Sequence, residues 1–214
     1  MNPQVLTAMP EQIIYLVDDD EALRDSLIWL LESQGFKVQG YPSAEAFLPE
    51  IRPDMTGCLL LDVRMPGGMS GLELHDRLRA SFCTLPVIFI TGHGDVPMAV
   101  SALKKGAVDF IEKPFNDEAL LRQVRQCLAQ EEENRARRRQ DAEVSRRLGQ
   151  LTQREREVLD LIILGKLNKQ IADVLGISIK TVEVHRARVM EKMGAQSLAE
   201  LVQSVMAIEG VNRG

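Results

Sequence analysis

Residues 58–78 read CLLLDVRMPGGMSGLELHDRL, and this stretch decides the fold of the first half of the chain. It opens with an apolar run of strand length that stops at Asp62. After a glycine-rich turn, Ser70 and Glu73 form the capping box of a helix that carries Leu74 and Leu78 on one face. A buried strand followed by an amphipathic helix is the repeating unit of an α/β fold.

Further units of the same kind lie on both sides of this stretch. Residues 13–17 and 86–90 are apolar runs that fit strands buried on both faces, whereas 36–41 and 109–111 are weaker and edge-like. Apolar residues with helical spacing separate them, at Leu23, Leu27, Leu30 and Leu31 before Gly35 and at Met98, Ala99, Ala102 and Leu103 before Gly106. Five strand-then-helix units predict a doubly wound, five-stranded parallel sheet.

Length and composition set the broad class of the protein. The 214 residues suffice for two small domains, and 45% apolar with 27% charged residues is ordinary for a soluble globular chain. The apolar run 13–17 is too short for a signal peptide or a membrane span. Cys58, Cys83 and Cys127 are far apart and lack metal-site spacing, which favours reduced thiols in the core. We therefore expect a cytoplasmic protein with no membrane partner.

The second half of the chain has a different pattern. Residues 131–147 (EEENRARRRQDAEVSRR) hold almost no large apolar side chain, so we expect a solvated, helical linker. A dimerising coiled coil would need an apolar seam, which is missing there. From residue 151 onward the chain reads as four helices, with capping residues at Thr152 and Glu155, Ser178, and Ser197 and Glu200. The short helix, glycine turn and longer helix of 168–193 have the layout of a helix-turn-helix.

Charge is divided unevenly between the two halves. Residues 1–127 carry 11 Lys and Arg against 18 Asp and Glu, whereas residues 128–214 carry 15 against 13. An acidic front and a mildly basic rear indicate different partners, with the rear half the candidate for nucleic acid.

Polar side chains follow four of the predicted strands. They are Asp18, Asp19 and Asp20 after the first strand, Asp62 after the third, Thr91 after the fourth and Lys113 after the fifth. In the common order of such sheets the first and third strands are neighbours, so we expect their aspartates to converge. Converging carboxylates repel each other unless a cation lies among them, and oxygen ligands favour Mg²⁺. An aspartate beside Mg²⁺, with lysine and threonine opposite, can attack phosphorus.

With these features the sequence resembles the response regulators of two-component signalling, of the FixJ-type branch, with a LuxR-type helix-turn-helix domain. The resemblance rests on VDDD (17–20), LLLDVRMPGGMSGLEL (59–74), VIFITGHGDVPMAV (87–100), KKGAVDFIEKPF (104–115), LTQREREVL (151–159) and NKQIADVLGISIKTVEVHRARVMEKM (168–193). It implies a flavodoxin-like receiver domain in 12–128, a charged helical linker in 129–147 and an all-α, four-helix DNA-binding domain in 148–214.

The resemblance also assigns roles at the edge of the sheet. The ligands of Mg²⁺ would be the side chains of Asp18, Asp19 and Asp62 and the backbone carbonyl of Arg64. Asp62 would accept the phosphoryl group, Thr91 and Lys113 would contact its oxygens, and Phe110 would move together with Thr91. The Lys113–Pro114 bond is cis in relatives. The loop 65–71 (MPGGMSG) has one glycine more than the MPGMSG of relatives.

In the rear domain the resemblance points to one outer helix face. Glu183, Val184 and Arg188 correspond to base-reading positions, and the candidate phosphate contacts are Lys169, Lys180, Thr181 and His185. Val174, Leu175, Val182, Val189 and Met193 are expected in the core. The implied partners are a sensor histidine kinase, double-stranded promoter DNA, RNA polymerase and, after phosphorylation, a second copy of the chain. The implied outcome is activation of transcription.

Two other classes of protein fit parts of the sequence. A phosphatase of the haloacid dehalogenase type would carry a second aspartate where this chain has Arg64, two residues after Asp62. A LuxR-type activator that senses a small molecule would need a ligand-binding front domain, and the aspartate cluster argues against one. We therefore expect no enzymatic activity other than Mg²⁺-dependent self-phosphorylation and dephosphorylation of the receiver. Retained acyl-phosphate label, as opposed to multiple turnover, separates a regulator from a hydrolase.

Overall fold

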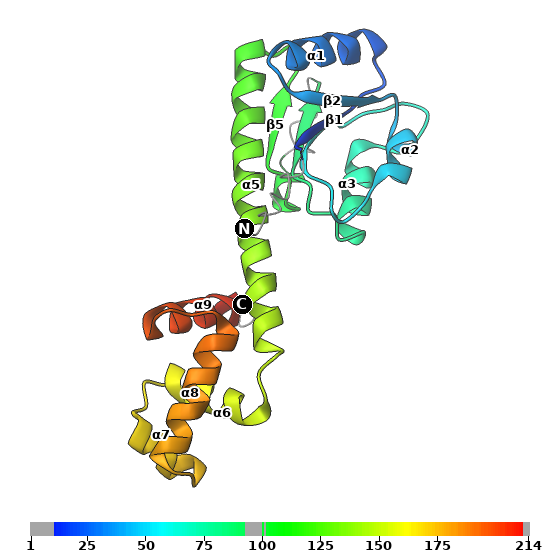
Figure 1. The fold of residues 1–214 in the computed structure, drawn as a ribbon. Coiled ribbons are helices and arrows are strands. Elements are labelled where there is room, and N and C mark those ends of the chain that lie inside the picture. The colour runs from blue at the N-terminus through cyan, green and yellow to red at the C-terminus, as the bar shows by residue number, and fades with distance from the viewer. Residues whose placement is uncertain (1–10, 93–99, 101, 212–214) are drawn as a thin grey trace, which may run out of the picture. The chain divides into compact units, whose positions relative to one another are not determined.

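A computed structural model describes residues 11–92, 100 and 102–211, with side chains up to residue 208. The chain divides into two compact units between residues 134 and 135 (Figure 1). The predicted helix before Gly106 is helical at Val100 and at residues 102–104, whereas Met98 and Ala99 lie outside the described residues.

The front unit is built on five parallel strands. They are β1 (Ile13–Val17), β2 (Lys37–Tyr41), β3 (Gly57–Asp62), β4 (Val87–Thr91) and β5 (Asp109–Glu112), in the order β2-β1-β3-β4-β5. Strands β3 and β4 are buried along their whole length, and β2 and β5 form the partly exposed edges. The predicted doubly wound, five-stranded parallel sheet is therefore confirmed.

Helices cover both faces of this sheet. They are α1 (Glu21–Ser33), α2 (Ala44–Phe47), the 3₁₀ turn η1 (Leu48–Glu50), α3 (Gly71–Ala80) and α5 (Asp117–Leu148). Alternate strand residues face two separate cores, because side chains of a strand alternate between its faces. Val17, Leu61 and Phe89 pack with α2 and α3, whereas Leu16 and Leu60 pack with α1 and α5. The predicted capping box of Ser70 and Glu73 opens α3.

The three cysteines are free and buried in the front unit, which agrees with core thiols. A hydrogen bond with Cys127, together with burial, holds the pKa of Cys58 well above its usual range, so it stays an unreactive thiol. No helix in the described part of the chain is long and apolar enough to cross a membrane.

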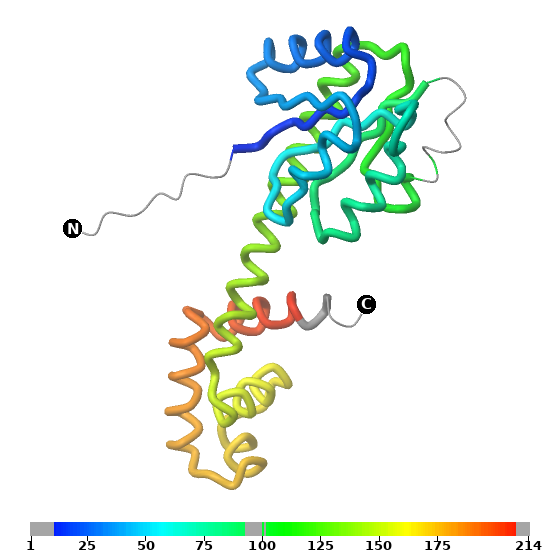
Figure 2. Tube along the Cα trace, turned by 90° about the vertical axis from the view of Figure 1, so that its right-hand side faces the viewer, coloured from blue at the N-terminus to red at the C-terminus, as the bar shows by residue number. Residues whose placement is uncertain are grey.

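The rear unit consists of helices around one core. They are α6 (Gln153–Ile163), α7 (Asn168–Leu175), α8 (Ile179–Met193) and α9 (Leu198–Val211) (Figure 2). Thr152 and Glu155 form the predicted capping box of α6, and Ser178 caps α8. Gly176 ends α7 with φ +64°, a left-handed conformation that glycine adopts without strain. The all-α unit with a helix-turn-helix is confirmed.

One predicted core residue of the rear unit lies outside the core. Val182, Val189 and Met193 of α8 are buried as predicted, and Leu175 packs partly against them, but Val174 is 63% exposed. The buried side of α7 is the narrow arc through residues 171, 172 and 175, and position 174 lies beyond that arc. The prediction for Val174 was wrong because a single apolar residue does not define the buried side of a short helix.

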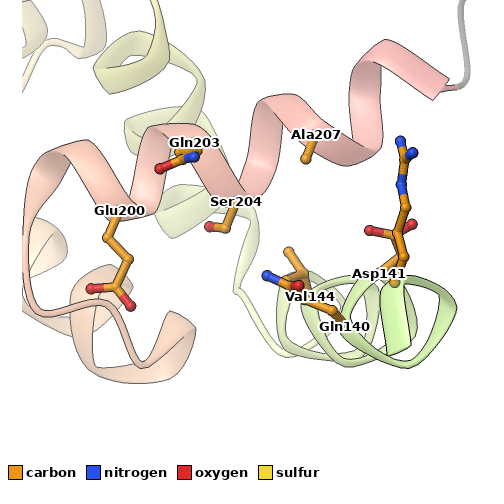
Figure 3. A pocket seen from close by; sticks show the side chains of 8 residues that line it. Gln140, Asp141, Val144, Glu200, Gln203, Ser204 and Ala207 are labelled. Atoms are coloured by element: carbon orange, nitrogen blue, oxygen red, sulfur yellow. The ribbon is translucent and has the colours of Figure 1, made fainter. Parts of the chain in front are cut away.

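The end of α5 belongs to the rear unit. Val144 and Leu148 pack against the core of α6–α9, and Nη1 of Arg147 donates a 2.6 Å hydrogen bond to the carbonyl of Met193 at the end of α8. A hollow of about 370 Å³ lies between this part of α5 and α9, lined by Val144 and Ser204 among others (Figure 3). The segment 131–147 is therefore helical, and it is not solvated throughout.

Candidate functional site

The predicted aspartates converge at the carboxyl end of the sheet. Strands β1 and β3 are neighbours with Val17 beside Leu61, so Asp18 and Asp62 lie next to each other where the strands end. Asp19 is exposed beside them, whereas the side chains of Asp18 and Asp62 are buried. One carboxylate oxygen from each of the three lies within 4.8 Å of those of the other two.

Lys113 faces two of these carboxylates. Its Nζ lies 2.7 Å from Oδ2 of Asp62 and 3.0 Å from Oδ2 of Asp18. The N–H of Lys113 also donates a 2.7 Å hydrogen bond to the carbonyl of Thr91, which ties the end of β5 to the end of β4. Burial lowers the pKa of Lys113, but its hydrogen bonds to Asp62 and Asp18 outweigh this effect and hold the pKa above its usual range. Lys113 is therefore a firm cation at neutral pH.

The cluster has the composition of a site for a hard cation. Burial raises the pKa of Asp18 above its usual range, and the hydrogen bond from Lys113 only partly offsets this effect. Three carboxylates with one lysine between them leave an excess of negative charge, and all three offer oxygen ligands. These residues fit Mg²⁺, which takes carboxylate oxygens and keeps several waters.

Thr91 and Phe110 lie on the two neighbouring strands beside the cluster. Thr91 ends β4 and is fully buried, with Oγ1 3.3 Å from the carbonyl of Gly92. Phe110 lies in β5 beside Phe89 and is only partly buried against the core that contains Phe89. The structure therefore places Thr91 and Phe110 on adjacent strands, and their coupled movement stays a prediction.

The loop after Asp62 is held by backbone contacts. The N–H of Arg64 donates a 3.0 Å hydrogen bond to Oδ1 of Asp62, and the N–H of Gly71 donates to the carbonyl of Val63. A Cβ at Gly71 would lie 2.0 Å from the carbonyl oxygen of Asp62, so only glycine permits this approach. The role of the Arg64 carbonyl as a Mg²⁺ ligand stays a prediction.

The additional glycine of this loop is accommodated by a contact from α2. Oε1 of Glu45 accepts a 2.6 Å hydrogen bond from the N–H of Met69, and a Cβ at Gly68 would lie 2.6 Å from the same oxygen. This hydrogen bond lowers the pKa of Glu45. Glu45 was not predicted as a site residue, because nothing in its local sequence pattern links residue 45 to a loop more than 20 residues away.

A second missed residue contacts the acidic cluster directly. Nη1 of Arg24, on α1, donates a 2.8 Å hydrogen bond to the backbone carbonyl of Asp18. Its only sequence signal is an arginine six residues after the first of three aspartates, one turn into the following helix. Such spacing also occurs on ordinary solvated helices, so the contact could be found only in the structure.

The candidate DNA-contacting residues lie on the outer side of the helix-turn-helix. Lys180, Val184 and Arg188 recur every four residues of α8, so they share one exposed face. Glu183 and Lys169 are exposed and line a common hollow of about 560 Å³. The remaining two candidates lie in the first half of α8: Thr181, whose Oγ1 is 2.8 Å from Oγ of Ser178, and His185, which is half-buried.

Comparisons with known proteins agree with this arrangement. Residues 14–125 match the response regulator receiver domain, and residues 149–205 match the luxR family of bacterial regulatory proteins. The transcriptional regulatory protein FixJ of Azorhizobium caulinodans is 50% identical over 199 residues, which cover 92% of this chain and 94% of that protein. The response regulator protein TodT of Pseudomonas putida is 44% identical over 191 residues, 89% of this chain and 84% of that protein.

Solved structures show the same likeness. The response regulator StyR is 45% identical, with a TM-score of 0.83 over 92% of this chain and 99% of that chain. Full-length FixJ from B. japonicum is 43% identical, with a TM-score of 0.58 over 94% of this chain and 99% of that chain.

A receiver joined to a luxR-family helix-turn-helix defines a response regulator that acts on transcription. The chain belongs to the FixJ-type response regulators. It is a transcriptional regulator with a two-component receiver, as the sequence predicts.

Proposed function

We propose that Asp62 is the phosphoryl acceptor and that its phosphorylation controls DNA binding by the rear unit. The observation that carries this proposal is the convergence of Asp62 with Asp18, Asp19 and Lys113 at one edge of the sheet. Of the three carboxylates, Asp62 ends the central strand β3 and has Lys113 at 2.7 Å, so a cation lies beside the oxygen that would carry the phosphoryl group.

The chemistry requires a nucleophile and charge compensation. A carboxylate oxygen of Asp62 attacks the phosphorus of a phosphohistidine or of acetyl phosphate, and the bond from phosphorus to imidazole or acetate breaks. Asp18, Asp19, Asp62 and the carbonyl of Arg64 would hold Mg²⁺, which neutralises charge on the phosphoryl oxygens when it is bound. Lys113 then pairs with one phosphoryl oxygen, and the Thr91 hydroxyl donates to another.

The test is labelling by acetyl phosphate with Mg²⁺. Asp62→Asn keeps the size of the side chain and removes the nucleophile, so labelling should disappear. Asp20→Asn is the matched control, because Asp20 caps α1 and should leave labelling intact. Full labelling of Asp62→Asn would refute the assignment, and release of phosphate over many turnovers would indicate a hydrolase instead.

We further propose that α8 reads DNA bases through Glu183, Val184 and Arg188. The proposed contacts to DNA phosphates are made by Lys169, Lys180, Thr181 and His185. The exposure of the face that carries Val184 and Arg188 supports this role. Arg188→Ala should lose about 1–3 kcal/mol of discrimination between bases at one position of the DNA site. Lys169→Ala should instead weaken binding to all DNA sequences alike and make the affinity less dependent on salt concentration. Uniform weakening by Arg188→Ala across operator variants would count against base reading.

We also propose that phosphorylation acts by forming a dimer through the receiver. The coupling of Thr91 to Phe110 would reposition the segment around β5, and exposed Val100 and Val108 flank this region. A small DNA-binding domain buries too little surface to bind tightly alone, so two half-sites are expected. A coupling of a few kcal/mol is enough to shift such an equilibrium.

Sedimentation with and without beryllofluoride tests the dimer. Val100→Glu and Val108→Glu should prevent association, whereas a charge at the exposed Trp29 of α1 (Trp29→Glu) should not. Ala107 is buried, so a charge there would disturb the core and is unsuitable for this purpose. A phosphorylated protein that binds operator DNA tightly as a monomer would favour release of the rear unit from the receiver.

The partners follow from the same assignments. We propose that a sensor histidine kinase donates the phosphoryl group, that the target is promoter DNA in the cytoplasm, and that the bound protein activates transcription by contacting RNA polymerase. Transcription in vitro from a promoter with a footprinted site, with and without the phosphate mimic, separates activation from repression.

A further inference from the structure

Every polar group of Asp18 has a partner within the front unit. Its N–H donates to the carbonyl of Tyr41, Oδ1 accepts from the N–H of Asp20, and Oδ2 accepts from Lys113. The backbone carbonyl accepts the 2.8 Å hydrogen bond from Nη1 of Arg24. Arg24 is the one side chain among these partners that bonds to the backbone of Asp18 and not to its carboxylate.

This hydrogen bond acts on the peptide that joins Asp18 to Asp19. The carbonyl of Asp18 and the N–H of Asp19 lie in one peptide plane, so a fixed carbonyl also fixes the backbone from which the Asp19 side chain departs. Asp19 is exposed, and its carboxylate reaches within 4.8 Å of the oxygens of Asp18 and Asp62. Repulsion among the three carboxylates favours turning this peptide away, and the bond to Arg24 opposes that movement.

The path of Arg24 is provided by a glycine on the neighbouring strand. A Cβ at Gly40 of β2 would lie 2.7 Å from Cδ1 of Ile28 and 3.4 Å from Cδ of Arg24. The aliphatic part of Arg24 therefore packs beside Gly40, and a side chain at position 40 would displace the end of Ile28. The hydrogen bond is therefore part of how α1 is packed on the sheet and is not an incidental surface contact.

We propose that Arg24 is a positioning residue for the Mg²⁺ site, which it prepares by holding the Asp18–Asp19 peptide. The proposal rests on the assignment of Asp18 and Asp19 as ligands. Arg24 contacts neither the metal nor the phosphoryl group; it keeps the two carboxylates directed at the position of the ion before the ion binds. Its loss weakens Mg²⁺ binding and leaves the phosphoryl transfer itself intact.

The experiment compares Mg²⁺ affinity with labelling rate in three variants of the full chain. Arg24→Met removes the donor and keeps the apolar stem that packs beside Gly40. Arg24→Lys keeps a donor of different geometry and tests rescue. Arg77→Met, an exposed arginine of α3, is the matched control. Mg²⁺ binding is measured by calorimetry, labelling by acetyl phosphate at low and at saturating Mg²⁺, and folding by urea unfolding without metal.

Arg24→Met should raise the Kd for Mg²⁺ on the order of 10-fold, the usual effect of losing a residue that orients a metal ligand. The Kd of Arg24→Lys should lie between those of Arg24→Met and the wild type, and the Kd of Arg77→Met should equal that of the wild type. At saturating Mg²⁺ the labelling rate of Arg24→Met should return to within about 2-fold of wild type. If Arg24→Met does not fold, Arg24→Lys carries the same comparison.

Two results would overturn the proposal. An unchanged Kd in Arg24→Met would show that the peptide is held without Arg24. A labelling rate reduced equally at all Mg²⁺ concentrations, with an unchanged Kd, would place Arg24 outside metal binding. Failure of the wild type to bind Mg²⁺ or to label would instead refute the proposed phosphorylation site.

Discussion

The ammonium nitrogen of Lys113 lies 2.7 Å from a carboxylate oxygen of Asp62 and 3.0 Å from one of Asp18, so a single lysine bridges the ends of β1 and β3. The contact joins residues that are 51 and 95 positions apart in the chain. It partly neutralises the acidic cluster.

The first prediction concerns this lysine. Lys113→Met leaves the carboxylates without their cation, so the free energy of unfolding without metal should fall by about 1–3 kcal/mol. Mg²⁺ should then stabilise the variant more than it stabilises the wild type, because it replaces the lost charge. Urea unfolding in EDTA and in Mg²⁺ measures both effects.

Lys105→Met is the control for this experiment. Lys105 pairs with Asp76 at 2.9 Å, but both side chains are about half exposed, so its loss should cost less than 1 kcal/mol. Equal unfolding curves for Lys113→Met and wild type in EDTA would contradict the prediction.

The second prediction concerns the close approach of Gly71 to Asp62. Gly71→Ala would place a methyl group 2.0 Å from the Asp62 carbonyl, so the backbone of the acceptor must shift. We expect a loss of about 1–3 kcal/mol in unfolding free energy and slower labelling of the folded protein. Gly67→Ala, in the same loop, has open space around its Cβ but φ +89°, so it should cost about 1 kcal/mol from strain and label normally. Normal labelling of Gly71→Ala would show that the backbone of Asp62 tolerates the shift.

The third prediction is a pH dependence in the rear unit. Glu155 is only 2% exposed, and hydrogen bonds from Lys192 at 2.6 Å and from the N–H of Thr152 lower its pKa to about 2. The pKa of Glu155 is lower in the folded state than its unfolded value of 4.5, so the carboxylate stabilises the fold at any pH above 4.5. This stability is lost as the pH falls from 4.5 towards 2. The rear unit should therefore weaken between about pH 5 and pH 2.

Glu155→Gln tests this dependence. The substitution should lower the free energy of unfolding by about 1–3 kcal/mol at pH 7. It should also make this free energy less dependent on pH below about 5, because no carboxylate remains to be protonated. Unfolding by urea with circular dichroism suffices, since the transition that Mg²⁺ does not shift belongs to the rear unit. Glu157→Gln, whose pair with Arg154 is on the surface, should leave the free energy of unfolding nearly unchanged. An acid dependence that persists in Glu155→Gln would assign it to another group.

The fourth prediction concerns where the rear unit begins. A fragment of residues 135–214 should be more stable than 149–214 by about 2–4 kcal/mol, because the shorter one lacks Val144, Leu148 and the Arg147 hydrogen bond to Met193. Arg147→Met in the longer fragment separates the hydrogen bond from the apolar packing. Equal stability of the two fragments would show that the end of α5 does not support α6–α9.

Most of the fold could be predicted from local patterns. The apolar runs of β3 and β4, the capping boxes at Ser70 and Thr152, and the glycine after α7 each act within a few residues, so the sequence displays them directly. The convergence of Asp18 and Asp62 followed from strand order, since neighbouring parallel strands end at the same edge. Val174 was misplaced because which side of α7 is buried depends on how the helices pack.

The sequence by itself determined the class of the protein, the sheet, the helix-turn-helix and the residues of the acidic cluster. Only the tertiary structure decided which contacts hold that cluster in shape: Arg24 on the carbonyl of Asp18, Glu45 on the loop with the additional glycine, and the Gly71 approach to Asp62. Periodicity and capping are encoded in neighbouring residues, whereas these contacts depend on the distance and direction between separately formed elements. Packing sets that geometry, and no local pattern records it.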